Sequence, residues 1–371
     1  MALKSWKQIV TDIANAFRNL TGSTANIKVG ELSGKINALN PVIFDEGYKG
    51  AVYLRSIDGG MERFNVTEIK DEIIDTDAVN LNVIWKLDQT VSSSDTDEEG
   101  LLYADMAGYF GKVDGFGSLI FKKYMSDQVA SVSVSKEKDE VYIADNGGKI
   151  SKYTKNGDKI SSVSVTKQLR SISLDNFGNI LSGSTDGHLY KYSSDLVKIW
   201  DINFESTQSI DDGCICTDSF NQIYTIVRNF GFYRISTSGV KKELGKGTGY
   251  FRMLATDNDG IVYVFWSSGN INYPNKIQRI ENDSLVDVVE TEEYFYGMKF
   301  DINNNLYVGS SDGNLKKHNK DFAVVWNHSI GEIFEGKVLN FDNNCNLYVC
   351  CNDSLWSIQN NTYKKKIAYY E

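Results

Sequence analysis

Two segments far apart in the chain share one pattern: Asp175-Asn-Phe-Gly-Asn-Ile-Leu-Ser-Gly-Ser-Thr-Asp-Gly-His-Leu189 and Asp301-Ile-Asn-Asn-Asn-Leu-Tyr-Val-Gly-Ser-Ser-Asp-Gly-Asn-Leu315. Each segment holds a polar turn, a strand-forming run, an Asp-Gly turn and the start of a second strand-forming run. Asp-Gly between two such runs is a strong hairpin signal, because Gly readily takes the positive φ that tight turns require. The two segments therefore predict a repeated antiparallel hairpin.

The hairpin belongs to a longer repeat that runs along most of the chain. A strand-forming residue, usually Tyr, follows a short polar turn at intervals of 39 to 44 residues. These seven register positions are Tyr103, Tyr142, Leu181, Tyr224, Tyr263, Tyr307 and Tyr348. Repeats of about 40 to 50 residues are typical of four-stranded propeller blades. The sequence therefore predicts a mainly β protein with a seven-bladed β-propeller over residues 93–371. A row of unrelated hairpins and an open β-solenoid are the alternatives.

One repeat can be followed strand by strand. Val129–Ser135 alternates apolar and polar residues, and strand-forming runs over 140–144, 149–153 and 159–165 follow after short turns. A blade cannot bury both of its faces alone, so the repeats must pack against one another. The stretch Val83-Ile-Trp-Lys-Leu87 resembles Lys198-Ile-Trp-Asp-Ile202. We therefore expect a strand before the first repeat to pair with the last blade.

The repeats resemble the NHL and quinoprotein-like propeller families over roughly residues 90–371. The residues that carry this resemblance are the Asp-x-x-Gly-Asn-Ile-Leu-Ser-Gly-Ser-Thr-Asp-Gly stretch at 175–187 and its relatives. The Trp-Asp dipeptides of WD40 repeats are missing from their expected places, although Trp200-Asp201 occurs once. Propellers serve many functions, so the resemblance implies the architecture only.

Residues 1–40 have a helical period instead. Apolar residues recur at i, i+3 and i+4 spacing, which predicts an amphipathic helix followed by a shorter one. The residues of this stripe are Trp6, Ile9, Val10, Ile13, Phe17 and Leu20. Residues 41–92 read as a connector with short strands, such as Ala51–Leu54, between turn-rich segments.

The wording of this N-terminal segment resembles a module of tail structural and fibre proteins from bacteriophages of Gram-positive hosts and from phage-tail-like bacteriocins. The matching residues are Ile13-Ala-Asn-Ala-Phe-Arg-Asn-Leu-Thr-Gly22, Ile27-Lys-Val-Gly-Glu-Leu32 and Ile36-Asn-Ala-Leu39. Phe17 and Leu20 depart from the usual pattern. The resemblance implies attachment to other tail or baseplate proteins and, since tail fibres are often trimers, a homotrimer seam along Trp6–Leu20. A plain helical hairpin packed on the propeller is the alternative.

Composition narrows the classes of partner. The chain has 371 residues and a formal net charge of -10, which disfavours nucleic acid and anionic membranes. No run approaches the roughly 18 apolar residues of a membrane span, and no signal peptide is recognisable at the N-terminus. We therefore expect synthesis in a cytoplasm, and the resemblance to tail proteins implies a bacterial host and residence in a virion or tail-like particle.

No strong catalytic or metal-binding pattern is present. The three His residues lack metal spacing, and the five Cys residues form no paired zinc motif. Asp257-Asn-Asp-Gly260 looks like the start of a calcium loop but lacks the later Glu, so a hairpin turn is expected. The sequence thus predicts no catalytic residues, no metal, no cofactor and no enzymatic activity.

A ligand-binding face is expected where the loops between second and third strands meet. The longest loop carries Trp and Tyr beside Asn and Ser, a combination that suits carbohydrate through ring stacking and hydrogen bonds. The candidates are Trp266, Asn270, Tyr273, Asp186, Asp312 and Asn229. Loop residues that merely cap the central channel are the alternative.

These observations predict a structural and binding component of a phage tail or tail-like particle, such as a fibre, tip or receptor-binding protein. Residues 1–40 would attach it, and the propeller would serve as a spacer or recognise a host cell-surface glycan. Two alternatives stay open at this point. One is a propeller enzyme, a polysaccharide lyase or glycosidase, that acts on cell-wall glycan; the other is a cytoplasmic scaffold.

Overall fold

A computed structural model describes residues 51–55, 61–75, 82–88, 90–97, 99–105, 108–135, 137–246, 249–270, 272–331, 338–343, 345–351, 353–359 and 362–370. Every regular element in these residues is a β-strand. The helical segment expected over residues 1–40, with all six residues of its apolar stripe, lies outside this part of the chain.

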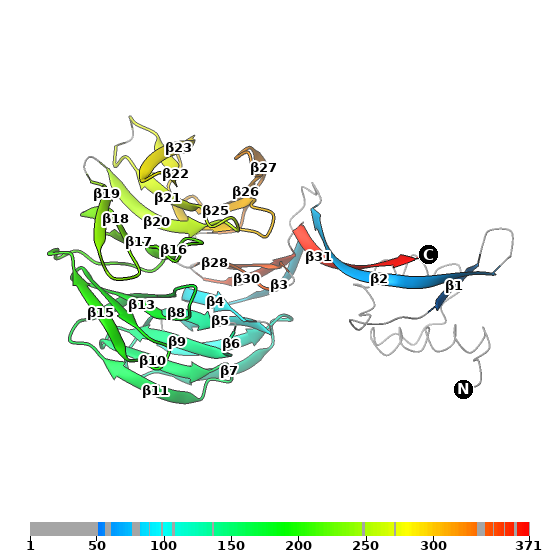
Figure 1. Ribbon diagram of the computed structural model, residues 1–371, viewed down its shortest axis with the longest axis horizontal. Helices are drawn as coiled ribbons and strands as arrows, with labels where there is room; N and C mark the ends of the chain where they lie inside the picture. Colours follow the sequence, from blue (N-terminus) through cyan, green and yellow to red (C-terminus); the bar gives the residue numbers. More distant parts are fainter. Residues whose placement is uncertain are drawn as a thin grey trace. The chain divides into compact units, whose positions relative to one another are not determined.

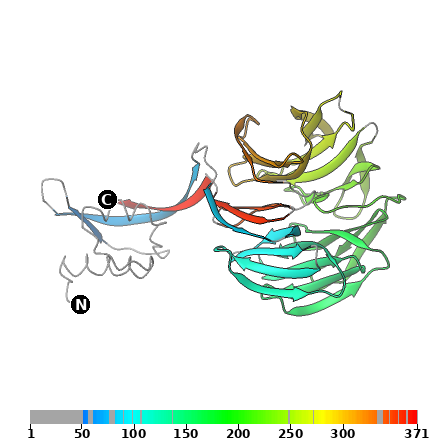
Figure 2. The same cartoon turned by 180° about the vertical axis from the view of Figure 1, so that it is seen from behind.

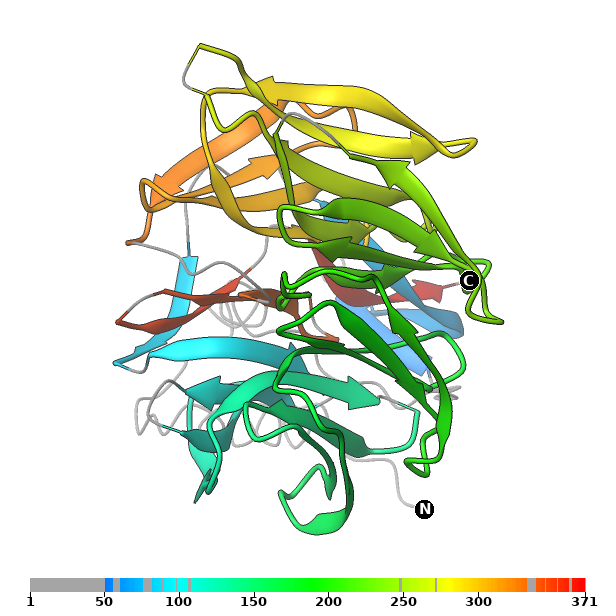
Figure 3. The same ribbon diagram turned by 90° about the vertical axis from the view of Figure 1, so that its left-hand side faces the viewer.

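Seven antiparallel sheets of four strands follow one another and form the β-propeller that the repeat predicts (Figure 1). Blades 1 to 3 are β4–β7 (Val91–Thr96, Gly100–Asp105, Tyr109–Asp114, Leu119–Tyr124), β8–β11 (Val129–Ser135, Glu140–Asp145, Lys149–Thr154, Lys159–Ser164) and β12–β15 (Leu169–Leu174, Ile180–Ser184, His188–Tyr192, Lys198–Asn203). Blades 4 to 6 are β16–β19 (Ile215–Thr217, Ile223–Val227, Gly231–Ile235, Lys241–Gly245), β20–β23 (Tyr250–Thr256, Val262–Ser267, Asn275–Glu281, Ser284–Thr291) and β24–β27 (Phe295–Phe300, Leu306–Ser310, Asn314–His318, Val324–Ser329). Figure 3 shows these sheets around the ring, from cyan and green to yellow and orange.

Blade 7 closes the ring with strands from both ends of the repeat region. It contains β28 (Leu339–Phe341), β29 (Leu347–Cys350), β30 (Leu355–Gln359) and, as its outermost strand, β3 (Asn82–Leu87). Pairing of β3 with β30 confirms the closing strand that the Trp85 stretch predicted. Trp85 Nε1 also donates to the Gly115 carbonyl at 2.9 Å, and its ring lies 5.7 Å from that of Tyr348. Figure 2 shows the cyan strands of blade 1 beside the red strands of blade 7.

The register positions all lie on second strands, but the one in blade 1 is displaced by one residue. In blades 2 to 7 the register residue pairs with a residue near the C-terminal end of the first strand, as Tyr142 pairs with Ser133. The equivalent residue in blade 1 is Leu102, which pairs with Asp95, whereas Tyr103 pairs with Ser94. Because strand side chains alternate, Tyr103 points to the other face. There it packs over Gly111, where a Cβ would lie 2.5 Å from its ring.

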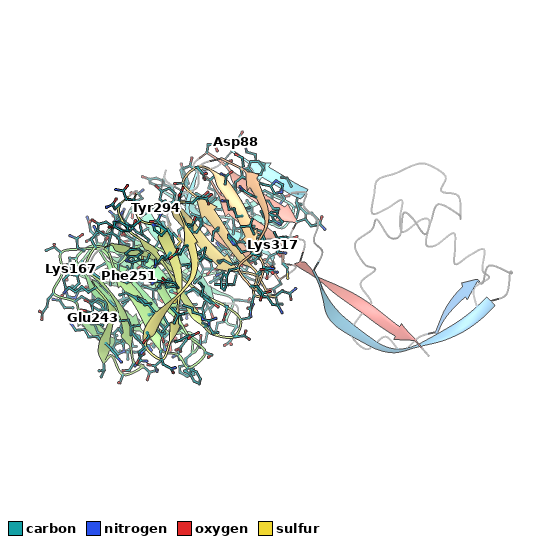
Figure 4. The ribbon with its side chains drawn as sticks, turned by 90° about the horizontal axis from the view of Figure 1, so that it is seen from above. Asp88, Lys167, Glu243, Phe251, Tyr294 and Lys317 are labelled. Atoms are coloured by element: carbon teal, nitrogen blue, oxygen red, sulfur yellow. The ribbon has the colours of Figure 1, made fainter. Side chains whose placement is uncertain are left out.

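A basic side chain recurs on the third strand of six blades, and we call these residues the basic array. Its members are Lys112, Lys152, Lys191, Arg234, Arg279 and Lys317. Lys191 Nζ lies 2.7 Å from Asp175, and Lys152 Nζ lies 2.7 Å from Glu140. Lys317, labelled in Figure 4, is buried with its Nζ 5.8 Å from the centroid of the Tyr307 ring. Buried ammonium groups need such partners, because an unpaired buried charge is costly.

A second compact unit lies outside the propeller. Its three-stranded sheet has the order β1 (Ala51–Arg55), β2 (Met61–Asp75) and β31 (Thr362–Tyr370). Residues 74–363 form the propeller unit, so most of β2 and β31 belong to the second unit. The segment expected as a connector over 41–92 therefore supplies strands to both units. The domain boundaries at residues 40 and 92 themselves stay predictions.

Candidate functional site

The first strands of all seven blades end at one cavity of about 390 Å³. Each blade contributes the residue that pairs with its register position, or with Leu102 in blade 1. We call these seven residues the channel ring: Asp95, Ser133, Ser173, Cys216, Ala255, Lys299 and Asn340. The volume of the cavity falls within the range of small-molecule pockets, about 300–1,000 Å³.

Local backbone geometry brings these side chains to the same level. In five blades the first strand carries a register shift two or three residues before the ring position, as between Val91 and Ser93 or between Phe295 and Gly297. Such a bulge inserts one unpaired residue and bends the strand. Because the irregularity recurs at the same point of the repeat, it sets a common register for the cavity end of these strands.

Two ring residues carry charge. Asp95 comes from blade 1 and Lys299 from blade 6, and these are the charged side chains among the described residues that line the cavity. Asp95 Oδ2 accepts a hydrogen bond from the Val134 amide at 2.9 Å, and Asp95 Oδ1 accepts one from the Thr96 amide at 2.9 Å. The carboxylate is thus held in place across the junction of blades 1 and 2, while the Lys299 side chain is exposed.

Hydroxyl and amide groups around the cavity tie neighbouring blades together. Thr96 Oγ1 donates to the Phe341 carbonyl at 2.7 Å, and Asn340 Nδ2 donates to Ser94 Oγ at 2.8 Å. Thr256 Oγ1 donates to the Thr217 carbonyl at 3.1 Å. These bonds fix the polar groups before any ligand arrives, which lowers the entropy lost on binding.

Cys216 supplies a thiol but not a thiolate. Burial raises the pKa of the Cys216 thiol to about 12, although a hydrogen bond with Thr256 and the charge of Lys299 act in the opposite direction. The thiolate is the nucleophilic form of cysteine, so Cys216 is unsuited to nucleophilic catalysis at neutral pH. The chemistry available at the ring is that of one ammonium, one carboxylate and several neutral hydrogen-bonding groups.

The residues proposed from the sequence for ligand binding do not line this cavity. Five of them lie on loops between second and third strands, and Trp266 is the last but one residue of β21, so all six are at the opposite end of the strands. Asp186 accepts from Ser184 Oγ at 2.8 Å, Asp312 accepts from Asn314 Nδ2 at 2.7 Å, and Asn270 accepts from the Asn272 amide at 2.9 Å. These bonds stabilise local turns.

The remaining three candidates also lie away from the cavity. The Tyr273 side chain is 65% exposed, the Trp266 ring packs against Gly249, and Asn229 adopts a positive φ in its turn. A role of this loop face in ligand binding stays a prediction. In the part of the chain that the structure describes, no three His, Cys, Asp or Glu side chains gather as a metal site, and no helix could span a membrane.

Two solved structures that share the fold are named as lyases. The chain is similar to a streptogramin B lyase, with a TM-score of 0.61 and 13% identity over 78% of this chain and 97% of that one. It is also similar to virginiamycin B lyase from Staphylococcus aureus, with a TM-score of 0.61 and 14% identity over 79% of this chain and 99% of that one. No protein-family model and no curated protein matches the chain.

These comparisons correct one prediction from the sequence. The absence of a recognisable motif led us to predict no enzymatic activity, and that prediction is contradicted by fold relatives that are themselves enzymes. A site at the channel ring would draw one residue from each repeat, so no two of its members would be close in sequence and no short motif would reveal it. At 13–14% identity the likeness establishes the seven-bladed propeller fold.

Proposed function

We propose that the propeller is a lyase-type enzyme that binds an acidic group of its substrate in the cavity at the channel ring. The observation that carries this proposal is the cavity itself, about 390 Å³ in volume and lined by a different blade at each of seven points. The lyase names of its fold relatives support the reaction class. A surface glycan that contains uronic acids is the substrate class we favour.

The ring residues suit an elimination. In this reaction a base removes the proton from the carbon next to a carboxylate, the bond to the leaving oxygen at the following carbon breaks, and a C=C bond forms. The leaving oxygen then takes up a proton. Lys299 would hold the substrate carboxylate and stabilise the negative charge that develops there. Asp95 would accept the proton as general base.

The test is turnover on purified acidic polysaccharides, followed by the ultraviolet absorbance of the new C=C bond. Lys299→Ala should lower the rate by about 100-fold or more, the usual cost of removing a group that stabilises transition-state charge. Lys198→Ala, which removes an exposed lysine of β15 far from the ring, is the matched control. Asp95→Asn keeps the hydrogen-bond acceptor but removes the base.

The outcomes separate the alternatives. New reducing ends without the absorbance change would indicate a glycosidase. Breakdown of virginiamycin B with no action on any glycan would refute the glycan as substrate class and favour the substrate in the fold relative's name. No turnover on either class, or full activity of Lys299→Ala, would refute the proposal.

A role in a tail or tail-like particle is a second proposal. It rests on the N-terminal resemblance and on one structural observation. After β30 of blade 7 the chain continues into β31, which belongs to a separate sheet with β1 and β2. The chain segments before and after the propeller thus form one additional unit. This arrangement suits a unit that attaches the propeller to tail or baseplate proteins. Mass spectrometry of purified particles from the producing strain tests this, and absence of the protein from them would refute it.

A further inference from the structure

At two blade junctions the turns between first and second strands are joined by asparagine side chains, a contact that we call the asparagine bracket. The backbone amide of Asn176 in blade 3 donates to Asn221 Oδ1 in blade 4 at 2.8 Å. The backbone amide of Asn258 in blade 5 donates to Asn304 Oδ1 in blade 6 at 2.9 Å. In both pairs the second Asn is the fourth residue of its turn and has a positive φ, which Asn tolerates better than most residues.

This asparagine bracket is missing between blades 4 and 5. Ser219 and Gly260 occupy the two positions, and a Cβ on Gly260 would lie 2.4 Å from the Ser219 Cβ. The two turns therefore lie closer together here than a side chain at position 260 would allow. A groove of about 540 Å³ opens beside them, and residues of both blades line it, including Phe220, Tyr224, Arg234, Asp259, Asn282 and Asp283.

Every charged side chain that lines this groove has an ion-pair or hydrogen-bond partner. Arg234 and Lys242 of blade 4 both form ion pairs with Asp283 of blade 5. Asp259 Oδ2 accepts from Asn304 Nδ2 at 2.7 Å, and Asp218 Oδ2 accepts from the Tyr224 hydroxyl at 3.2 Å. Asp218 and Asp259 keep their negative charge because their donors are neutral, so the groove disfavours an anion.

An aromatic ring stands beside these polar groups. Phe220 is 82% exposed, which leaves its face free to stack on the C–H face of a sugar ring. Paired carboxylates, a guanidinium and an amide can each make hydrogen bonds to sugar hydroxyls, which both donate and accept. We propose that the groove between blades 4 and 5 is a binding site for a neutral glycan, separate from the channel ring.

The blade 3 turn offers a matched control. Phe177 is the third residue of its turn, as Phe220 is in blade 4, and its side chain is 72% exposed. The turn that carries it is bracketed to blade 4, and Phe177 does not line the groove. Phe220→Ala and Phe177→Ala therefore remove the same exposed ring, once at the groove and once away from it.

The experiment is methyl NMR of the full chain, with the methyl groups of Ile261, Val262 and Ile280 as reporters inside the groove. The probes are neutral hexasaccharides of glucose, mannose and N-acetylglucosamine at concentrations on the order of 10 mM, which cover the weak affinities of single sugar contacts. We expect at least one probe to shift these signals. Phe220→Ala should weaken the interaction about tenfold, whereas Phe177→Ala and Lys299→Ala should leave it unchanged.

Several results would overturn the proposal. These are no shift with any hexasaccharide, shifts with a lysine-rich peptide alone, and equal binding by Phe220→Ala and the unsubstituted chain. Loss of binding in Lys299→Ala would assign the sugar to the channel ring instead. Loss of lyase activity, by contrast, has no bearing on these NMR signals, so the two proposals fail separately.

Discussion

The basic array and the channel ring are both built once per repeat, yet their residues behave in opposite ways. The basic array keeps a Lys or Arg in six blades, with Ser357 in the seventh, and its lysines are buried with acidic or aromatic partners. The channel ring holds six residue types at seven positions around a cavity. Positions that repeat therefore stabilise each blade from within, and positions that vary are free to supply chemistry.

The largest effect should come from opening the ring that both sets depend on. Deletion of Asn82–Leu87 removes the outermost strand of blade 7 and the hydrogen bond from Trp85 to Gly115. We expect loss of the cooperative thermal transition, measured by circular dichroism, because blade 7 loses a quarter of its sheet and the junction of blades 1 and 7 keeps only cavity-side bonds such as Thr96 to Phe341. Trp85→Phe, which keeps the strand, should retain a transition. An unchanged melting temperature after the deletion would refute the role of this strand in closure.

Breaking a member of the basic array should have the next largest effect. Asp175→Ala leaves Lys191 buried without its carboxylate partner, which should lower the free energy of unfolding by about 3–5 kcal/mol. The exposed pair of Lys123 and Asp158 provides a control, since Asp158→Ala should cost less than about 1 kcal/mol. Denaturation with urea would measure both. Equal losses would show that burial of the pair is unimportant.

The same aspartate should make stability depend on pH. Burial acts to raise the pKa of Asp175, but hydrogen bonds from Lys191 and Asn179 outweigh it and hold the pKa below its usual value. A lowered folded-state pKa gives stability that is present above the unfolded value and is lost as pH falls through the folded value. The stability gap between the unsubstituted chain and Asp175→Ala should therefore narrow below about pH 3.8. A constant gap in acid would contradict the shift.

The sequence predicted the repeated part of the molecule well and the site poorly. Tyr142 and its counterparts mark the second strand of each blade, because the equivalent buried positions of different blades require similar residues. The strand at Trp85 was recognisable for the same reason. Only the mark in blade 1 was displaced, since Leu102 and Tyr103 both look like strand residues and alternation alone cannot choose between them.

The channel ring left a weaker signal. Its members precede the register positions by about eight residues, as Lys299 precedes Tyr307, so the repeat could have located them. Nothing in the sequence indicated that this end of the strands holds the cavity, because cavity volume depends on how blades pack. The loop carrying Trp266 and Tyr273 drew attention instead, since its composition resembles that of a binding loop.

A smaller effect is expected for the ring thiol. With the pKa of Cys216 raised to about 12 by burial, the thiol should react slowly with a disulfide reagent at pH 8, although it lines the cavity. Cys216→Ser should identify its contribution to the reaction of the native chain. Rapid labelling of Cys216 at this pH would show that the thiolate is accessible and reopen its role as a nucleophile.

The most direct test of the division between fold and function is one lysine from each set, measured on the same samples. Lys299→Ala should change the free energy of unfolding by less than about 0.5 kcal/mol, as for an exposed residue, while turnover on acidic glycan falls about 100-fold. Lys191→Ala should show the reverse order of effects, with a large loss of stability. Turnover by Lys299→Ala at the rate of the unsubstituted chain would contradict the assignment of function to the channel ring.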